Sequence, residues 1–156
     1  MKKIFLVASF FYSIIIQAQT TENSSEVIPT LEVQKAFQKE FPKVKPVWRK
    51  EFSGSDKDEL TYEADFSVNN SNMTAVYNAI GVFKVLQFEI KPTEIPVRIS
   101  SYMEKNYPKN KIEKAAKMMT NDNKITYEIG ITINGKWSDA VFDKEGDFLE
   151  MVQKDN

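Results

Sequence analysis

The stretch LTYEADF at residues 60–66 recurs as ITYEIGI at residues 125–131, and this repetition decides the fold. The two copies lie 65 positions apart, and two further pairs share that spacing: AVY at 75–77 with AVF at 140–142, and GVF at 81–83 with GDF at 146–148. Upstream the match continues at slightly longer spacing, with Phe-Pro at 41–42 and Tyr-Pro at 107–108, and with Ile-Pro at 28–29 and 95–96. A repeat of this length predicts two similar units, each a supersecondary block or a small domain.

Both copies alternate apolar and polar residues, which is the pattern of a β-strand with one buried face and one face in water. The apolar positions are Tyr62, Ala64, Phe66 and Val68 in the first copy, and Tyr127, Ile129, Ile131 and Ile133 in the second. The same alternation predicts that Glu63, Asp65 and Glu128 point outward as solvated charges.

A helix is predicted at the start of each unit. Val33, Phe37 and Phe41 lie four positions apart and form one apolar stripe. Thr30 is a favourable N-cap before the stripe, and Pro42 ends the helix. The second unit repeats this design with Ile99, Met103, Tyr107 and Pro108. We expect these helices to cover one face of a sheet.

Four strands follow each predicted helix, joined by turns rich in Asn, Asp and Gly. They are expected at 44–52, 62–68, 73–78 and 82–90, and again at 112–119, 127–133, 136–142 and 147–153. The segment 112–119 also fits a helical period, and it is predicted as a strand because its counterpart alternates. Gly81 and Gly146 are expected to adopt a positive φ.

The predicted fold class is therefore α+β, with two tandem repeats that each pack a helix on a four-stranded antiparallel meander sheet. The sequence leaves open whether the two sheets join edge to edge.

Composition excludes several kinds of chemistry. The chain of 156 residues is 42% hydrophobic and 28% charged, which is typical of a globular protein. It contains no Cys and no His, so disulfides, thiolate zinc sites and imidazole catalysis are excluded. No cofactor is predicted.

Residues 1–18 have the pattern of a secretory signal peptide: Lys2 and Lys3, an apolar run from Ile4 to Ile16, and Ala18 before the expected cleavage point. The apolar run is shorter than the roughly 20 residues that a membrane-spanning helix needs. We expect a leader at 19–27, one repeat at 28–91 and a second at 92–156, with no membrane span after cleavage. Removing residues 1–18 leaves 19 basic and 22 acidic residues, a net charge of −3, which disfavours nucleic acid as a partner.

Carboxylates are the main acid–base groups that remain, but no pattern of a catalytic site accompanies them. Glu63 and Glu128 occupy equivalent positions in different repeats and need not lie near each other. Asp143, Glu145 and Asp147 fall in one turn, but the first repeat has no carboxylate there, which favours a plain turn over a calcium loop. No enzymatic activity and no metal site are predicted.

The order of these motifs resembles the PepSY-like, beta-lactamase-inhibitor-like family of secreted bacterial proteins. The motifs are a helix ending in Phe-Pro or Tyr-Pro, Val-Trp at 47–48, Tyr-Glu-Ala-x-Phe at 62–66, Ala-Val-Tyr at 75–77 and Gly-x-Phe at 81–83. The resemblance covers residues 28–152. It implies helices behind antiparallel sheets, an open sheet face that grips a partner protein, and a periplasmic setting.

Two features depart from the tandem inhibitors that this resemblance implies. Those inhibitors carry disulfides, and they use acidic or aromatic side chains on an inserted hairpin. This chain has no Cys, and its turn at 69–72 has neither a carboxylate nor a ring. The resemblance thus bears on the fold more directly than on lactamase inhibition.

We therefore expect a non-enzymatic module, periplasmic or secreted, that binds a periplasmic protein or peptide with its open sheet face; inhibition of an enzyme is one form that such binding takes. The residues expected on that face are Glu63, Asp65, Glu128, Thr132 and Trp137. Aromatic residues beside charges are favoured at protein interfaces, and either Trp48 or Trp137 is a candidate for this role. The alternative is an envelope sensor that binds a small molecule or ion in the groove between the units.

Overall fold

The computed structural model describes residues 27–53 and 59–153. The predicted signal peptide and nearly all of the leader lie outside the described residues. The first half contains α1 (Leu31–Glu40), β1 (Val47–Ser53), β2 (Glu59–Val68), β3 (Ser71–Asn78) and β4 (Phe83–Glu89). The second half contains the short 3₁₀ helix η1 (Pro92–Glu94), α2 (Val97–Asn106), β5 (Lys114–Thr120), β6 (Ile125–Ile133), β7 (Lys136–Asp143) and β8 (Phe148–Gln153).

All eight strands form one antiparallel sheet whose strand order is the order of the sequence. The two halves join where β4 pairs with β5, from Val85 opposite Thr120 to Glu89 opposite Ala116. The sheet is therefore continuous, which answers the question that the sequence left open. The α+β class, the antiparallel meander and the strand at 112–119 are confirmed.

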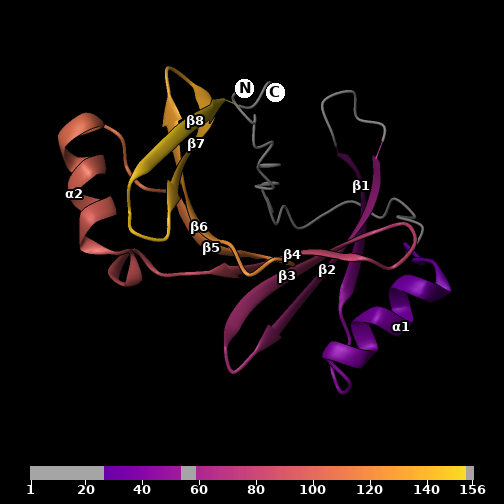
Figure 1. Ribbon diagram of the computed structural model, residues 1–156. Helices are drawn as coiled ribbons and strands as arrows, with labels where there is room; N and C mark the ends of the chain where they lie inside the picture. Colours follow the sequence, from indigo (N-terminus) through magenta and orange to yellow (C-terminus); the bar gives the residue numbers. More distant parts are fainter. Residues whose placement is uncertain (1–26, 54–58, 154–156) are drawn as a thin grey trace, which may run out of the picture.

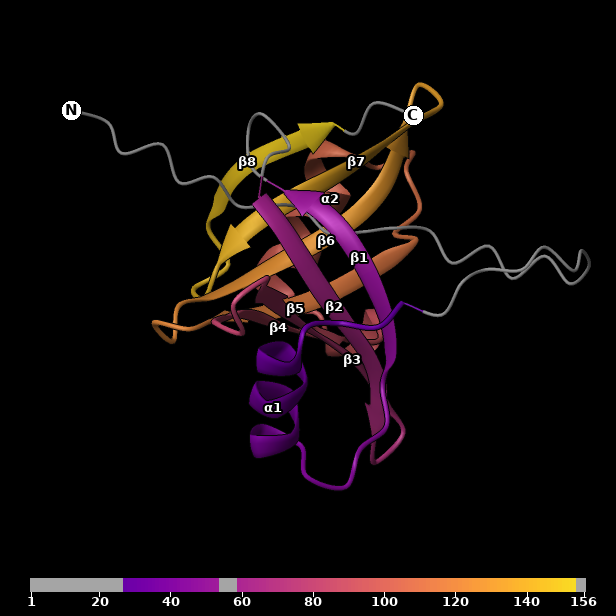
Figure 2. The ribbon, with the colours of Figure 1, turned by 90° about the vertical axis from the view of Figure 1, so that its right-hand side faces the viewer.

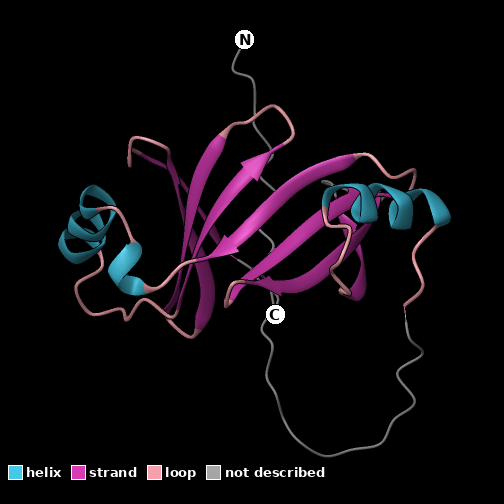
Figure 3. Cartoon of the chain, turned by 90° about the horizontal axis from the view of Figure 1, so that it is seen from below, coloured by secondary structure: helices cyan, strands magenta, loops and turns pink. Residues whose placement is uncertain are grey.

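The sheet bends strongly, and both helices lie on its outer, convex side at opposite ends (Figure 1 and Figure 3). Figure 2 shows β1 and β2 crossing the direction of β6, β7 and β8, as the twist of a long sheet requires. The inner, concave face carries no helix of the described residues.

Each helix packs on its own half of the sheet. The helix residues Val33 and Phe37 pack with the strand residues Tyr62, Ala64, Phe66, Ala75, Tyr77 and Leu86. In the second half, Ile99 and Met103 pack with Ala115, Ile129, Ile131, Ala140 and Phe142. The predicted helical stripes and the N-cap are confirmed, since the Thr30 hydroxyl accepts a hydrogen bond from the Val33 N–H.

Trp48 belongs to this convex-side core. Its ring lies edge-on to the Phe37 ring, with centroids 5.4 Å apart. It therefore does not lie on the open, concave face of the sheet.

A glycine turn fixes the start of each helix against the sheet. Gly81 and Gly146 have φ of 82° and 83°, as predicted. A Cβ on Gly81 would lie 2.8 Å from the backbone carbonyl of Glu32 in α1, and a Cβ on Gly146 would lie 3.2 Å from Cβ of Arg98 in α2. The Thr30 hydroxyl also donates to the carbonyl of Ala79, at 2.9 Å. The close approach of turn and helix thus requires glycine for two reasons, conformation and space.

We expect Gly81→Ala to lower the free energy of unfolding by roughly 3 kcal/mol, because a side chain is strained at this φ and would meet the helix backbone. Gly135→Ala is the matched control. Its φ is 77°, but nothing lies within 4 Å of a Cβ there, so only the conformational cost of about 1 kcal/mol should appear. Urea unfolding measures both. Equal losses would show that the contact with α1 does not matter.

Candidate binding face of the sheet

The five residues predicted to bind a partner all lie on the concave face. The strand registers align Glu63 with Val76, Asp65 with Thr74, Glu128 with Val141 and Thr132 with Trp137. The alternate residues of these strands belong to the two helix-facing cores. The alternation in the sequence therefore assigned Glu63, Asp65, Glu128 and Thr132 to the correct face of the sheet.

The expectation that Glu63 and Glu128 are solvated is wrong. Their exposed fractions are 2% and 0%. Glu63 lies between Arg49 of β1 and Val76 of β3, and Glu128 lies between Ala116 of β5 and Val141 of β7. A concave sheet brings such cross-strand neighbours together, so a residue on an inner strand becomes buried even on the face without helices.

Arg49 organises the first half of this face. Its Nη2 lies 2.9 Å from Oε2 of Glu63, and its Nε and Nη2 donate to the two carboxylate oxygens of Asp65 at 2.5 and 2.9 Å. The Thr74 hydroxyl donates to the same carboxylate at 2.7 Å. Burial alone would lower the pKa of Arg49, but the hydrogen bond to Asp65 and the charges of Glu63, Asp65 and Glu51 outweigh it and raise the pKa above its ordinary value. The guanidinium is therefore a fixed positive charge at the rim of the face.

Trp137 organises the second half. Its indole Nε1 donates to Oδ1 of the buried Asp139 at 2.7 Å. A Cβ on Gly130 would lie 2.3 Å from Cζ2 of Trp137, so the ring rests directly on the glycine backbone. The ring also packs near Ala116 and Met118. The indole is half-buried and held by these contacts on the concave face, and its role as an aromatic anchor stays a prediction.

Thr132 is exposed at the end of β6, where its hydroxyl donates to Oε1 of Glu113 at 2.7 Å. Arg49, Thr74 and Asp139 belong to the same face and were not predicted from the sequence. Asp139 follows Trp137 by two positions on one strand, so the period of two could have placed both on one side. Arg49 required the register of β1 against β2, which the sequence alone does not give.

The acidic turn of the second half is closed by hydrogen bonds within the turn. The Asp143 carboxylate accepts hydrogen bonds from the backbone N–H groups of Glu145 and Asp147, at 3.0 and 2.8 Å. Asp147 forms an ion pair with Arg98. Across the residues that the structure describes, no group of three or more acidic side chains is arranged to hold a metal ion.

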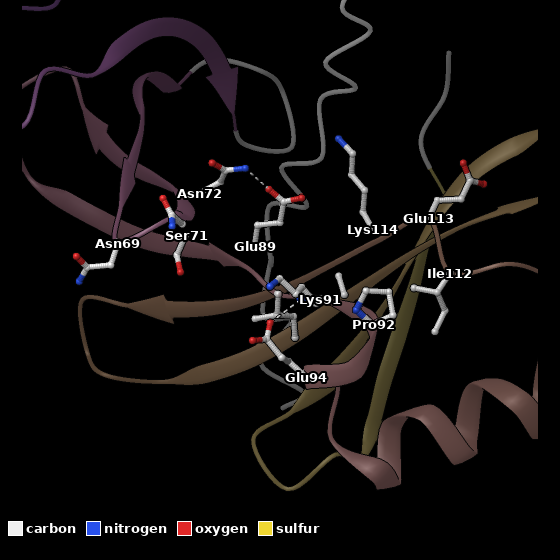
Figure 4. Close-up of a pocket in the computed structure, with 13 residues that line it drawn as sticks. Asn69, Ser71, Asn72, Glu89, Lys91, Pro92, Glu94, Ile112, Glu113 and Lys114 are labelled. Carbon is white, nitrogen blue, oxygen red and sulfur yellow. Dashed lines mark hydrogen bonds between the residues drawn. The ribbon is translucent and has the colours of Figure 1, made fainter.

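A pocket of about 350 Å³ opens where the two halves meet (Figure 4). Asn69 and Asn72 of the β2–β3 hairpin, Glu89, and the linker residue Lys91 line one side, and Ile112, Glu113 and Lys114 line the other. Asn72 donates to Glu89 at 2.8 Å, and the Lys91 N–H donates to Glu94 at 2.7 Å. The lining mixes polar and apolar side chains and draws on both halves of the chain.

Comparison with known proteins identifies the fold. No family model matches the sequence, and no curated protein does. Similar solved structures include a protein described as periplasmic from Bacteroides eggerthii and a DUF2874 family protein from Bacteroides uniformis. Each has a TM-score of 0.68 and 14% identity, over 81% of this chain and 90% of the other. A BLIP-like protein from Bacteroides fragilis has a TM-score of 0.63 and 18% identity, over 85% of this chain and 91% of that one.

These similarities define the class of the fold. The chain has a BLIP-like α+β fold, so this part of the resemblance is confirmed, while its PepSY-like part stays a prediction. At such identities the similarity establishes the fold and not the activity. No helix among the described residues has the length and apolar character needed to cross a bilayer.

We expect Arg49→Met to lower the free energy of unfolding by about 3 kcal/mol, because it removes the cation that faces the buried Glu63. Lys84→Met is the matched control. It removes the cation of an exposed pair, Lys84 with Glu59 at 2.7 Å, and should cost about 0.5 kcal/mol. Adding Glu63→Gln to Arg49→Met should restore part of the loss. Equal costs for the two Met variants in urea unfolding would show that Arg49 does not stabilise the face.

Proposed function

We propose that this chain is a non-enzymatic binding module that takes a protein or peptide on the concave face of its sheet. The observation that carries this proposal is the pair of fixed groups on that face, the Arg49–Asp65 ion pair in one half and the Trp137 indole in the other. Both are partly exposed and held by hydrogen bonds. Preorganised arginine and tryptophan side chains are the groups that dominate protein interfaces.

Burial divides the predicted site residues into two roles. Asp65, Thr132 and Trp137, together with Arg49, are the groups that a partner would contact. Glu63 and Glu128 would form a buried layer beneath them that supports the surface. Inhibition of a partner enzyme is one outcome of such binding.

We further propose that the module works in the periplasm. The signal-peptide pattern of residues 1–18 supports this setting, and so does the fold shared with a protein described as periplasmic. The helix followed by four strands occurs in both halves, which supports tandem repeats at 28–91 and 92–156. A leader at 19–27 is proposed from the polar sequence of that segment alone. The absence of His and Cys from the sequence supports a binding role over a catalytic one.

Capture of partners by residues 19–156 from periplasmic extract, with identification by mass spectrometry, tests the binding face. We expect a specific partner whose recovery falls at least roughly tenfold with Trp137→Leu or Thr132→Arg, as for the loss of an interface anchor. Ser101→Arg, an exposed change on the convex side in α2, is the matched control and should keep the partner. If Trp137→Leu and Thr132→Arg both keep every partner, the concave face is not the binding surface. A captured enzyme would be assayed directly for inhibition.

The alternative function is an envelope sensor, and the pocket between the halves favours it. A ligand there would contact both halves and stabilise the native state by mass action. We expect, on this alternative, that a divalent metal or an envelope metabolite raises the melting temperature of the wild type and not that of Glu89→Gln. No shift with any of these ligands would exclude the sensor.

A further inference from the structure

The carboxylates of the sheet all face the same way. The eight strands contain nine acidic residues, and the registers place every one on the concave face: Glu51, Glu59, Glu63, Asp65, Glu89, Glu128, Asp139, Asp143 and Glu150. The opposite, helix-facing side of the strands has no acidic residue and carries Lys50, Lys117 and Lys136.

Few cations offset these charges on the concave face. Arg49 lies on this side and pairs with both Glu63 and Asp65, so that cluster keeps a net negative charge. Lys114 also points to this side, and Lys84 pairs there with Glu59 at 2.7 Å. A surface that only needs to be soluble intersperses both signs. Since the chain as a whole has a net charge of only −1, the acidic excess belongs to one face and not to the composition.

The excess is accessible to a partner. Glu89 and Glu150 are exposed and Glu51 is half-buried, and they lie on β4, β8 and β1. One of them lies on the central strand β4 and the other two lie on the edge strands β1 and β8. The accessible negative charge therefore extends across the whole concave face. A concave surface of one sign focuses the electrostatic potential and favours ligands of the opposite sign.

Trp137 adds an independent feature. The half-buried indole lies on this same face, packed on Gly130 and fixed by its bond to Asp139. Lysine and arginine side chains bind well against the face of an indole, through cation–π attraction and the packing of their aliphatic stems.

We infer that the partner on the concave face is a cationic segment, a lysine- or arginine-rich stretch of a protein or peptide, with one basic side chain against Trp137. This inference rests on the proposed function and names the chemistry of its partner. Charge complementarity would steer the encounter and reject acidic segments.

Fluorescence anisotropy with two labelled peptides tests the inference at low ionic strength. One peptide alternates Lys and Ala, and the other alternates Glu and Ala. We expect the lysine peptide to bind, the glutamate peptide not to bind, and added salt to weaken the binding.

The decisive comparison uses two triple variants with the same net charge. The first variant removes three negative charges from the concave face by combining Glu51→Gln, Glu89→Gln and Glu150→Gln. It should lower the affinity for the lysine peptide by roughly tenfold. The second variant removes three negative charges from exposed positions of α1 and α2 by combining Glu32→Gln, Glu40→Gln and Glu104→Gln. It should change the affinity for the lysine peptide by less than about twofold. Circular dichroism checks that both variants are folded.

Equal effects of the two triple variants, binding of the glutamate peptide, or no binding of the lysine peptide would overturn the inference. Failure of the inference is distinguishable from failure of the proposed function. One result would support the binding module and refute its preference for cations. In that result, recovery of a captured partner falls with Trp137→Leu and Thr132→Arg but stays unchanged with the triple variant of the concave face.

Discussion

Side chains alternate along a β-strand, so a single sheet has two faces, and the structure of this chain depends on how its residues are divided between them. The convex face receives the apolar rows that pack under α1 and α2. The concave face receives all the strand carboxylates together with Arg49 and Trp137. Because β4 pairs with β5, this division extends without a break from β1 to β8. One rule of local geometry therefore separates the stabilising core from the proposed binding surface.

The two halves share a backbone design and differ in the side chains of the concave face. Glu63 faces Arg49 across the strands, whereas its counterpart Glu128 faces Ala116. In the first half, Asp65 accepts hydrogen bonds from Arg49. The equivalent position of the second half is Gly130, whose lack of a side chain leaves space for the Trp137 ring. The two halves thus share the helix, the glycine turn and the core, while each half presents a different chemical group on the concave face. Under the proposed function, this asymmetry would make the two ends of the concave face chemically different to a bound partner.

Much of this could be predicted from the sequence because it follows from local periodicity. The spacing of Val33 and Phe37 indicated a helix, the alternation around Tyr62 indicated a strand, and Gly81 indicated a turn with positive φ. The face of Glu63, Asp65, Glu128 and Thr132 followed from the same alternation. The rest depended on contacts between distant segments. Pairing of β4 with β5, the neighbourhood that buries Glu63 and Glu128, and the meeting of Arg49 with Asp65 all require a register that no local pattern contains.

The sequential strand order also has a consequence for how the chain folds. Every pairing joins strands that are consecutive in the sequence, and most of them close only short loops. The exception is β4 with β5, whose connection at 90–113 contains α2 and must be closed before the halves become one sheet. Loop closure costs more entropy as the connection lengthens, and folding slows as contacts become less local. The hairpins of each half should therefore form early, and the pairing that creates the full concave surface should form last.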